Sequence, residues 1–181
     1  MSSARLLQDQ LCQAHEFLDG TMDGVTDEQL HWQPEGFANP LGATYAHLVL
    51  GEDAFVSALA GARPLFEDGR ADRVGVSELP PMAEPGALVR LEPEWHDWAR
   101  SVRVDLPVLR EYAAAVHATS DRYLGSLDDQ DLDQMIDLSG VGFGQQSLAW
   151  ILSEGLVGHV RAHWGEIACL KGMQRGKGFP R

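Results

Sequence analysis

The stretch that decides the fold spans residues 148–170 and reads LAWILSEGLVGHVRAHWGEIACL. Its apolar residues recur every three or four positions, which places them on one face of an α-helix. They are Leu148, Ile151, Leu152, Leu156, Val160, Trp164, Ile167 and Leu170. Ser147 is available as the N-cap residue and Gly172 as a stop signal. The stretch therefore predicts a long amphipathic helix close to the C-terminus of the chain.

Two histidines stand on this predicted helix at the spacing of one turn. His159 and His163 are four residues apart, so their β-carbons lie about 6 Å apart on one face. Two imidazoles at that spacing can bind one metal ion at about 2.0–2.1 Å each. Glu166 shares the face, but Val160 follows the first histidine, so this is not the HExxH motif of metalloproteases. A pair of half-buried or surface histidines explains the spacing equally well, and a metal site needs a third ligand from elsewhere.

Three further stretches show the helical spacing of apolar residues. They span residues 3–19, 40–60 and 105–127. Asn39 is the expected N-cap of the second helix, and Asp105 is the expected N-cap of the third. Four long helices joined in series, without an internal repeat or a second-domain boundary, predict an all-α, up-down four-helix bundle.

The connections between these helices differ in length. Residues 61–92 are rich in glycine and proline and have no clear period. They predict a long crossover loop, of the kind that covers a functional site or is poorly ordered. A short helix is expected at residues 94–99, with Trp95 and Trp98 packed inward. The prediction for residues 1–181 is thus one bundle domain with a long crossover loop and short extra helices.

His47 is a third candidate for a buried role. It lies in the predicted helix of residues 40–60, on a face with small residues that let another helix approach closely: Ala43, Gly51, Ala54 and Ala58. A lone histidine on such a face is more often a satisfied interior residue than a ligand, so both interpretations stay open. His15 is expected at the boundary or surface of its helix, and His117 at a structural or exposed position.

The composition bounds the partners and the compartment. The 181 residues carry a net charge of −13 without a basic stripe, which disfavours nucleic acid and anionic membranes as partners. The chain has neither a signal-peptide core nor an apolar run that could span a bilayer, so we expect a cytoplasmic protein. Cys12 and Cys169 make no disulfide framework and no CxxC motif. Each is expected to be a small core residue in a reducing compartment.

Three sequence features together resemble a known family. His47 stands in the segment YAHLVLGED, His159 and His163 stand in H-x-x-x-H-W-G-E-I, and residues 26–34 read TDEQLHWQP. These motifs are similar to those of the DinB/YfiT-like superfamily of four-helix bundles. The motifs are individually loose but jointly fairly specific, and the resemblance covers nearly the whole chain.

The resemblance implies a metal site. In that family a histidine of the second long helix and an H-x-x-x-H pair of the last helix bind a divalent metal. An up-down-down-up type of bundle with His47, His159 and His163 as metal ligands is therefore expected. Three histidines without cysteine suit Zn²⁺, Ni²⁺ or Fe²⁺. Glu166 and Glu52 are candidates for orienting an imidazole or handling a proton. A homodimer, common in the family, is also expected.

The resemblance also implies a class of reaction. Family members include S-transferases that use bacillithiol and the metal-binding part of a mycothiol-dependent isomerase. By this resemblance, a low-molecular-weight thiol is activated by the metal and attacks an electrophilic small molecule. Two alternatives stay open: a metal-dependent hydrolase that activates water at the same site, and a metal-binding, stress-associated bundle without turnover. The sequence does not decide whether the protein is an enzyme.

Overall fold

The computed structural model describes residues 2–66, 71–81 and 92–180. Over these residues the chain is mostly helical, as predicted. The helices are α1 (Ser3–Met22), α2 (Asp27–His31), α3 (Leu41–Leu59), α4 (Ala71–Val74), α5 (Glu92–Ser101), α6 (Leu106–Ser126), α7 (Leu148–Trp150) and α8 (His159–Met173). A π-helical segment (Ile151–Gly158) joins α7 to α8, so these three pieces form one continuous rod.

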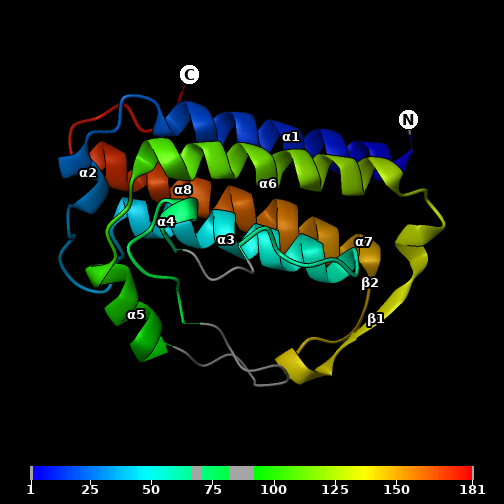
Figure 1. Ribbon diagram of the computed structural model, residues 1–181. Helices are drawn as coiled ribbons and strands as arrows, with labels where there is room; N and C mark the ends of the chain where they lie inside the picture. The colour runs from blue at the N-terminus through cyan, green and yellow to red at the C-terminus, as the bar shows by residue number, and fades with distance from the viewer. Residues whose placement is uncertain (1, 67–70, 82–91, 181) are drawn as a thin grey trace.

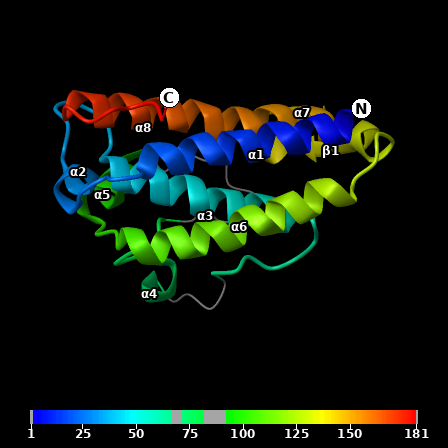
Figure 2. The ribbon, with the colours of Figure 1, turned by 90° about the horizontal axis from the view of Figure 1, so that it is seen from above.

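Four long rods lie side by side: α1, α3, α6 and the rod that ends in α8 (Figure 1). The helix α1 packs against α6 and α8, and α3 packs against the same two helices from the opposite side. Figure 1 shows α1 and α8 running in one direction and α3 and α6 in the other. Each long helix therefore has two neighbours, and the view from above shows the same arrangement (Figure 2).

Apolar burial along these four helices forms one core. The predicted stripes are buried where the helices face each other, as at Leu11 and Leu18 of α1, Leu109 of α6, and Val160 and Ile167 of α8. Each large aliphatic side chain that leaves water contributes about 1.5–3 kcal/mol. The bundle is thus stabilised mainly by the apolar stripes that the sequence displays.

The helix ends agree with most of the predicted caps. Ser147 and Asp105 each accept a hydrogen bond from the backbone N–H three residues further on, at 3.2 and 3.3 Å. The prediction for Asn39 is wrong, because the N-cap of α3 is Pro40, which makes no side-chain cap. The side-chain oxygen of Asn39 is buried, and no hydrogen bond to it is found within the described part of the chain.

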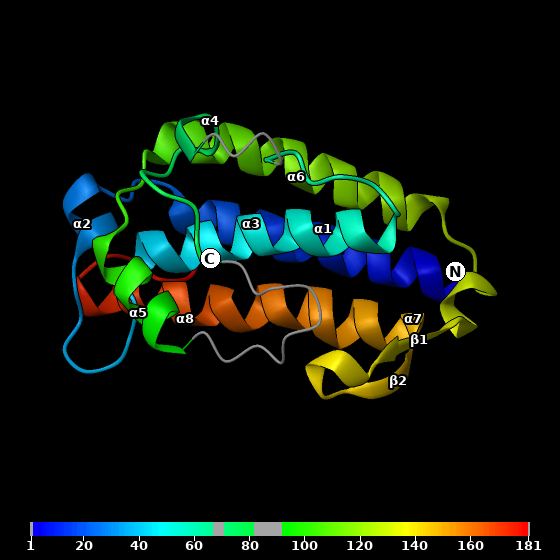
Figure 3. The ribbon, with the colours of Figure 1, turned by 60° about the horizontal axis from the view of Figure 1, so that its bottom comes forward.

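A small β-hairpin departs from the all-α prediction. Strands β1 (Met135–Leu138) and β2 (Gly144–Ser147) pair antiparallel, with Met135 opposite Ser147 (Figure 3). Gly142 in the turn and Gly144 at the start of β2 have φ values of 87° and 66°, which are easily adopted only by glycine. The hairpin lies at the end of the bundle beside α7, where it extends the connection from α6 to the last rod.

The two cysteines lie further out than predicted. Cys12 is only half-buried and Cys169 is exposed. The helix α1 also continues past Gly20, its predicted stop, to Met22. Pro180, near the end of the chain, would lie 3.0 Å from a β-carbon added at Gly20, so the C-terminal segment packs against this helix.

The crossover between α3 and α6 contains more structure than predicted. It includes α4 and an isolated bridge between Val76 and Val104. The short helix expected at residues 94–99 is confirmed as α5, and its Trp98 is buried. The remaining parts of the predicted 61–92 loop, residues 67–70 and 82–91, lie outside the described residues.

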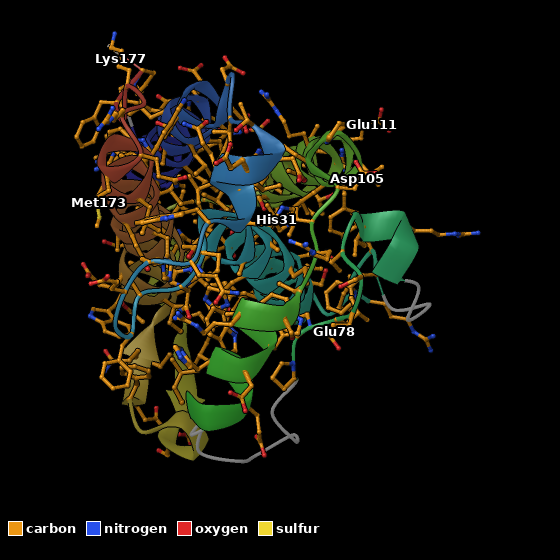
Figure 4. The ribbon with its side chains drawn as sticks, turned by 90° about the vertical axis from the view of Figure 1, so that its left-hand side faces the viewer. His31, Glu78, Asp105, Glu111, Met173 and Lys177 are labelled. Carbon is orange, nitrogen blue, oxygen red and sulfur yellow. The ribbon has the colours of Figure 1, made fainter. Side chains whose placement is uncertain are left out.

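The end of the bundle around α2 is tied together by His31. Its Nδ1 is 3.1 Å from a carboxylate oxygen of Asp27, and its Nε2 accepts a hydrogen bond from the backbone N–H of Val104 at 3.0 Å (Figure 4). The contact fixes α2 to the segment that leads into α6.

No helix of the described residues has the length and apolar character needed to cross a membrane.

Gly75 is a position where the fold requires glycine. Its φ is +79°, and a β-carbon there would lie 2.5 Å from the backbone nitrogen of Leu109. We expect Gly75→Ala to lower the free energy of unfolding by about 3 kcal/mol, from the left-handed backbone and the clash together. Gly24→Ala is the matched control, because Gly24 has a φ of +67° but open space around it. Gly24→Ala should lower the free energy of unfolding by about 1 kcal/mol. If urea denaturation gives the same loss for both variants, the close approach of Gly75 to Leu109 has no role in stability.

Candidate metal centre

Three histidines from two distant segments meet between α3 and α8. His47 comes from the first half of α3, and His159 and His163 come from the first two turns of α8. One ring nitrogen of each lies within 4.8 Å of the other two. All three side chains are partly buried. The structure therefore brings together the three residues that the sequence singled out as candidate ligands.

The ring geometry of this His47–His159–His163 cluster suits one shared ion. Rings bound at 2.0–2.1 Å place their centroids about 3.2 Å from the metal, so centroids lie about 4.5 Å apart at a right angle and about 5.2 Å apart at a tetrahedral angle. The observed separations are 5.3 Å for His47 and His159, 5.1 Å for His47 and His163, and 4.6 Å for the α8 pair. The ring planes are nearly perpendicular, at 78°, 80° and 89°. A single ion can therefore lie close to all three ring planes.

Burial keeps the imidazoles of His47 and His159 uncharged. Burial, followed by the charges that would develop on His159 and His163, lowers the pKa of His47 to about 4. Burial and then His163 lower the pKa of His159 to about 4 as well. A neutral imidazole has the free lone pair that a metal needs, so these two rings are ready to act as ligands at neutral pH.

Glu166 fixes the orientation of one ring. The Nδ1 of His163 lies 2.9 Å from Oε2 of Glu166 and donates a hydrogen bond to it. That bond assigns the proton to Nδ1 and leaves the lone pair of Nε2 available. Carboxylates commonly orient metal-binding histidines in this way. The arrangement is the one expected of Glu166 as a residue that orients an imidazole.

One tryptophan of α5 lies next to the cluster, and a second packs against the first. The ring of Trp95 packs edge-on against His47, with centroids 4.9 Å apart, and Trp98 lies 5.4 Å from Trp95. Figure 3 shows α5 near the end of α3 that carries His47. The inward packing predicted for both tryptophans gives the cluster an aromatic wall.

The sequence pattern did not predict the π-helical segment directly before His159. The regular three-four spacing predicted an uninterrupted α-helix, whereas Ile151–Gly158 is wound more loosely. Such insertions occur frequently at functional sites. Gly155 and Gly158 are the available sequence signal. A β-carbon at Gly155 would lie 3.1 Å from the ring of Phe55, so this segment approaches α3 closely.

Glu52 does not reach the three-histidine cluster. Its carboxylate is buried and accepts hydrogen bonds from Nε2 of His15 at 2.9 Å and from the hydroxyl of Ser120 at 2.5 Å. Together with His117 it forms a second cluster, between α1, α3 and α6. The surface or boundary position predicted for His15 is wrong, because this side chain is buried. Its pairing with a buried carboxylate, which offsets the cost of burying an imidazole, was not visible in the sequence.

The His15–Glu52–His117 cluster differs from the first in its ring geometry. One ligand atom of each residue lies within 4.8 Å of the others, so by spacing the group could hold a metal ion. However, the rings of His15 and His117 are stacked 3.6 Å apart and inclined by only 6°. An ion cannot lie in two parallel planes at once, so one ring would first have to turn. The three-histidine cluster is therefore the better metal centre.

Comparison with known proteins identifies the family. The model of the DinB superfamily matches residues 10–167, which include both clusters. The chain belongs to the DinB superfamily. A conserved protein from Enterococcus faecalis, known from a crystal structure, shares 19% of its sequence with a TM-score of 0.73. That match covers 94% of this chain and 96% of the other, and it shows a common fold for the two proteins. A search of curated proteins finds no match.

The hydrogen bond from His163 to Glu166 predicts a measurable effect on metal affinity. Glu166→Gln removes the carboxylate and should weaken divalent-metal binding about 10–100-fold, because the ring loses its orientation and some basicity. Glu111→Gln is a matched control, since Glu111 is exposed on α6 (Figure 4) and the change in charge is the same. Competition titration with a chromophoric chelator measures both, and equal affinities for the two variants would contradict the assigned contact.

Proposed function

We propose that this DinB-superfamily protein binds one divalent metal ion through His47, His159 and His163 and transfers a low-molecular-weight thiol to an electrophilic small molecule. The observation that carries the proposal is the convergence of three nearly perpendicular imidazoles from two helices. The thiol transfer rests on the resemblance to thiol-dependent S-transferases of this superfamily, including those that use bacillithiol.

The donor set favours a catalytic rather than a structural metal. Structural zinc sites use four protein ligands, whereas catalytic sites use three and keep a position for water or substrate. Within the described residues the cluster provides three nitrogen donors and no sulfur. Such donors suit Zn²⁺, Ni²⁺ or Fe²⁺. An ion held there supplies positive charge that lowers the pKa of a thiol, so that a nucleophile exists at neutral pH.

Other residues of the chain support this chemistry in separate ways. Glu166 holds the ring of His163 through Oε2. Its side chain is 38% exposed, so its second oxygen can accept the proton of an incoming thiol. Trp95 covers one side of His47 and limits the access of water from that direction. Arg161 is exposed and serves as a surface charge.

The biological setting belongs to the same proposal. A cytoplasmic location suits a protein that uses a reduced thiol, because that compartment keeps thiols reduced. Homodimeric assembly is proposed from the family resemblance. The net charge of −13 favours small-molecule partners over nucleic acid or an anionic membrane.

The metal assignment is tested by elemental analysis. The wild-type protein, loaded with Zn²⁺ or Ni²⁺ and desalted, should retain about one ion per chain, and His47→Ala, His159→Ala and His163→Ala should each retain almost none. His96→Ala is the control, because His96 lies outside both histidine clusters. If His47→Ala folds and keeps its metal, the convergence of α3 and α8 is not a metal centre.

The thiol transfer is tested with the Co²⁺-substituted protein. Cysteine, used as a probe thiol, should shift the visible absorption bands of the wild type and leave a His159→Ala sample unchanged, because thiolate coordination alters the ligand field. The same wild-type sample should then conjugate cysteine to 1-chloro-2,4-dinitrobenzene. Unchanged bands together with hydrolysis of an activated ester would favour the hydrolase instead. If the protein shows neither thiol conjugation nor hydrolysis, it is a metal-binding protein without turnover.

A further inference from the structure

The second cluster occupies the junction of α1, α3 and α6. His15 comes from α1, Glu52 from α3 and His117 from α6, and their side chains are only 8%, 1% and 11% exposed. Three ionisable groups in one buried place are costly unless their charges balance. The proposed thiol transfer uses none of them.

The carboxylate of Glu52 supplies one buried negative charge. Burial alone would raise its pKa, but the hydrogen bond and charge of His15 and the hydroxyl of Ser120 hold the pKa of Glu52 below its usual value. Glu52 is therefore ionised at neutral pH.

The stacking of the two rings disfavours a positive charge on both imidazoles at the same time. The centroids of His15 and His117 are 3.6 Å apart in nearly parallel planes, and like charges at that distance in a buried site repel strongly. The Nε2 atom of His117 is buried and has no hydrogen-bond partner among the described residues, so a proton placed there gains no contact. Burial, followed by the charge of His15, lowers the pKa of His117 to about 4.

We propose that His15, Glu52 and His117 form a proton-sensing centre, in which the stacked and buried ring of His117 stays uncharged in the folded bundle, so that mild acid destabilises the junction of α1, α3 and α6. The ligand of this centre is a proton rather than a metal ion, because the parallel rings cannot share an ion as they lie. The inference does not depend on the proposed thiol transfer.

The surroundings of His117 support this assignment. From α1 it faces His15 and also Asp19, whose carboxylate oxygen is 4.0 Å from Nδ1 and is too distant for a hydrogen bond. From α3 it faces Glu52, which is already paired with His15 and Ser120. The helix α4 packs near the first turn of α6, well before His117 in the helix, as the contact of Gly75 with Leu109 shows. Glu52 and Asp19 therefore attract a charge on His117 only in part, and burial together with the charge of His15 outweighs the attraction of Glu52.

The sign of the pH effect follows from these contacts. In the unfolded chain His117 binds a proton at its ordinary pKa of 6.5, whereas in the folded chain it does so only near pH 4. The contribution of uncharged His117 to the free energy of unfolding is complete above pH 6.5. It is lost as the pH falls toward 4, because the unfolded state then binds more protons than the folded state. Between pH 7 and pH 5, His117 alone should raise the equilibrium constant of unfolding about 20-fold.

The test compares wild type with His117→Phe, both loaded with the same metal, by urea denaturation at pH 7, 6 and 5. Phenylalanine keeps an aromatic ring against His15 but cannot take a proton. From pH 7 to pH 5, the unfolding constant of wild type should rise by a factor about 20 times larger than that of His117→Phe. The control His96→Phe should show the same rise as wild type. Equal pH dependence of His117→Phe and wild type would overturn the proposal.

Two measurements on the unmodified protein keep the inference testable if the variant folds poorly. Proton–nitrogen NMR of the histidine rings should show no imidazolium at His117 between pH 7 and pH 5. Zn²⁺ titration should saturate at about one ion per chain. An imidazolium at His117 in this pH range, or a second ion that His117→Phe or His15→Phe removes, would show that His117 does accept positive charge in the folded bundle.

Discussion

The close packing of α3 against α8 is the constraint on which the rest depends. Neither helix carries the complete candidate metal site: α8 supplies two imidazoles at the spacing of one turn, and α3 supplies the third. The rings come within reach of one ion only because buried apolar stripes bring the two helices together. The energy of burial that stabilises the bundle therefore also fixes the geometry of the site.

Much of this arrangement could be predicted from local patterns. The four long helices follow from three-four spacing, since a periodic apolar stripe has few other ways to leave water. The residues His159 and His163 were visible as a pair because both lie on one helix, where spacing in sequence fixes spacing in space. His47 was different: its helix could be predicted, but its position opposite α8 was implied only by the family resemblance.

What the sequence did not display are features decided by contacts between segments. Glu52 and His15 satisfy each other across two helices, so neither pattern alone reveals that both are buried. The hairpin of residues 135–147 has strands of four residues, too short for a clear alternation, and depends on glycines at positive φ. Asn39 has the right identity for an N-cap, but the chain enters α3 through Pro40 instead.

The π-helical segment has a consequence for the register of the last helix. Each residue of an α-helix turns the chain by about 100°, so removing one residue between Ile151 and Gly158 would rotate everything that follows as a unit. His159, His163 and Glu166 would keep their mutual spacing but would swing together away from His47. The direction in which these three side chains point therefore depends on the number of residues in the preceding segment. An insertion or deletion there would separate them from His47 without changing any of the three residues.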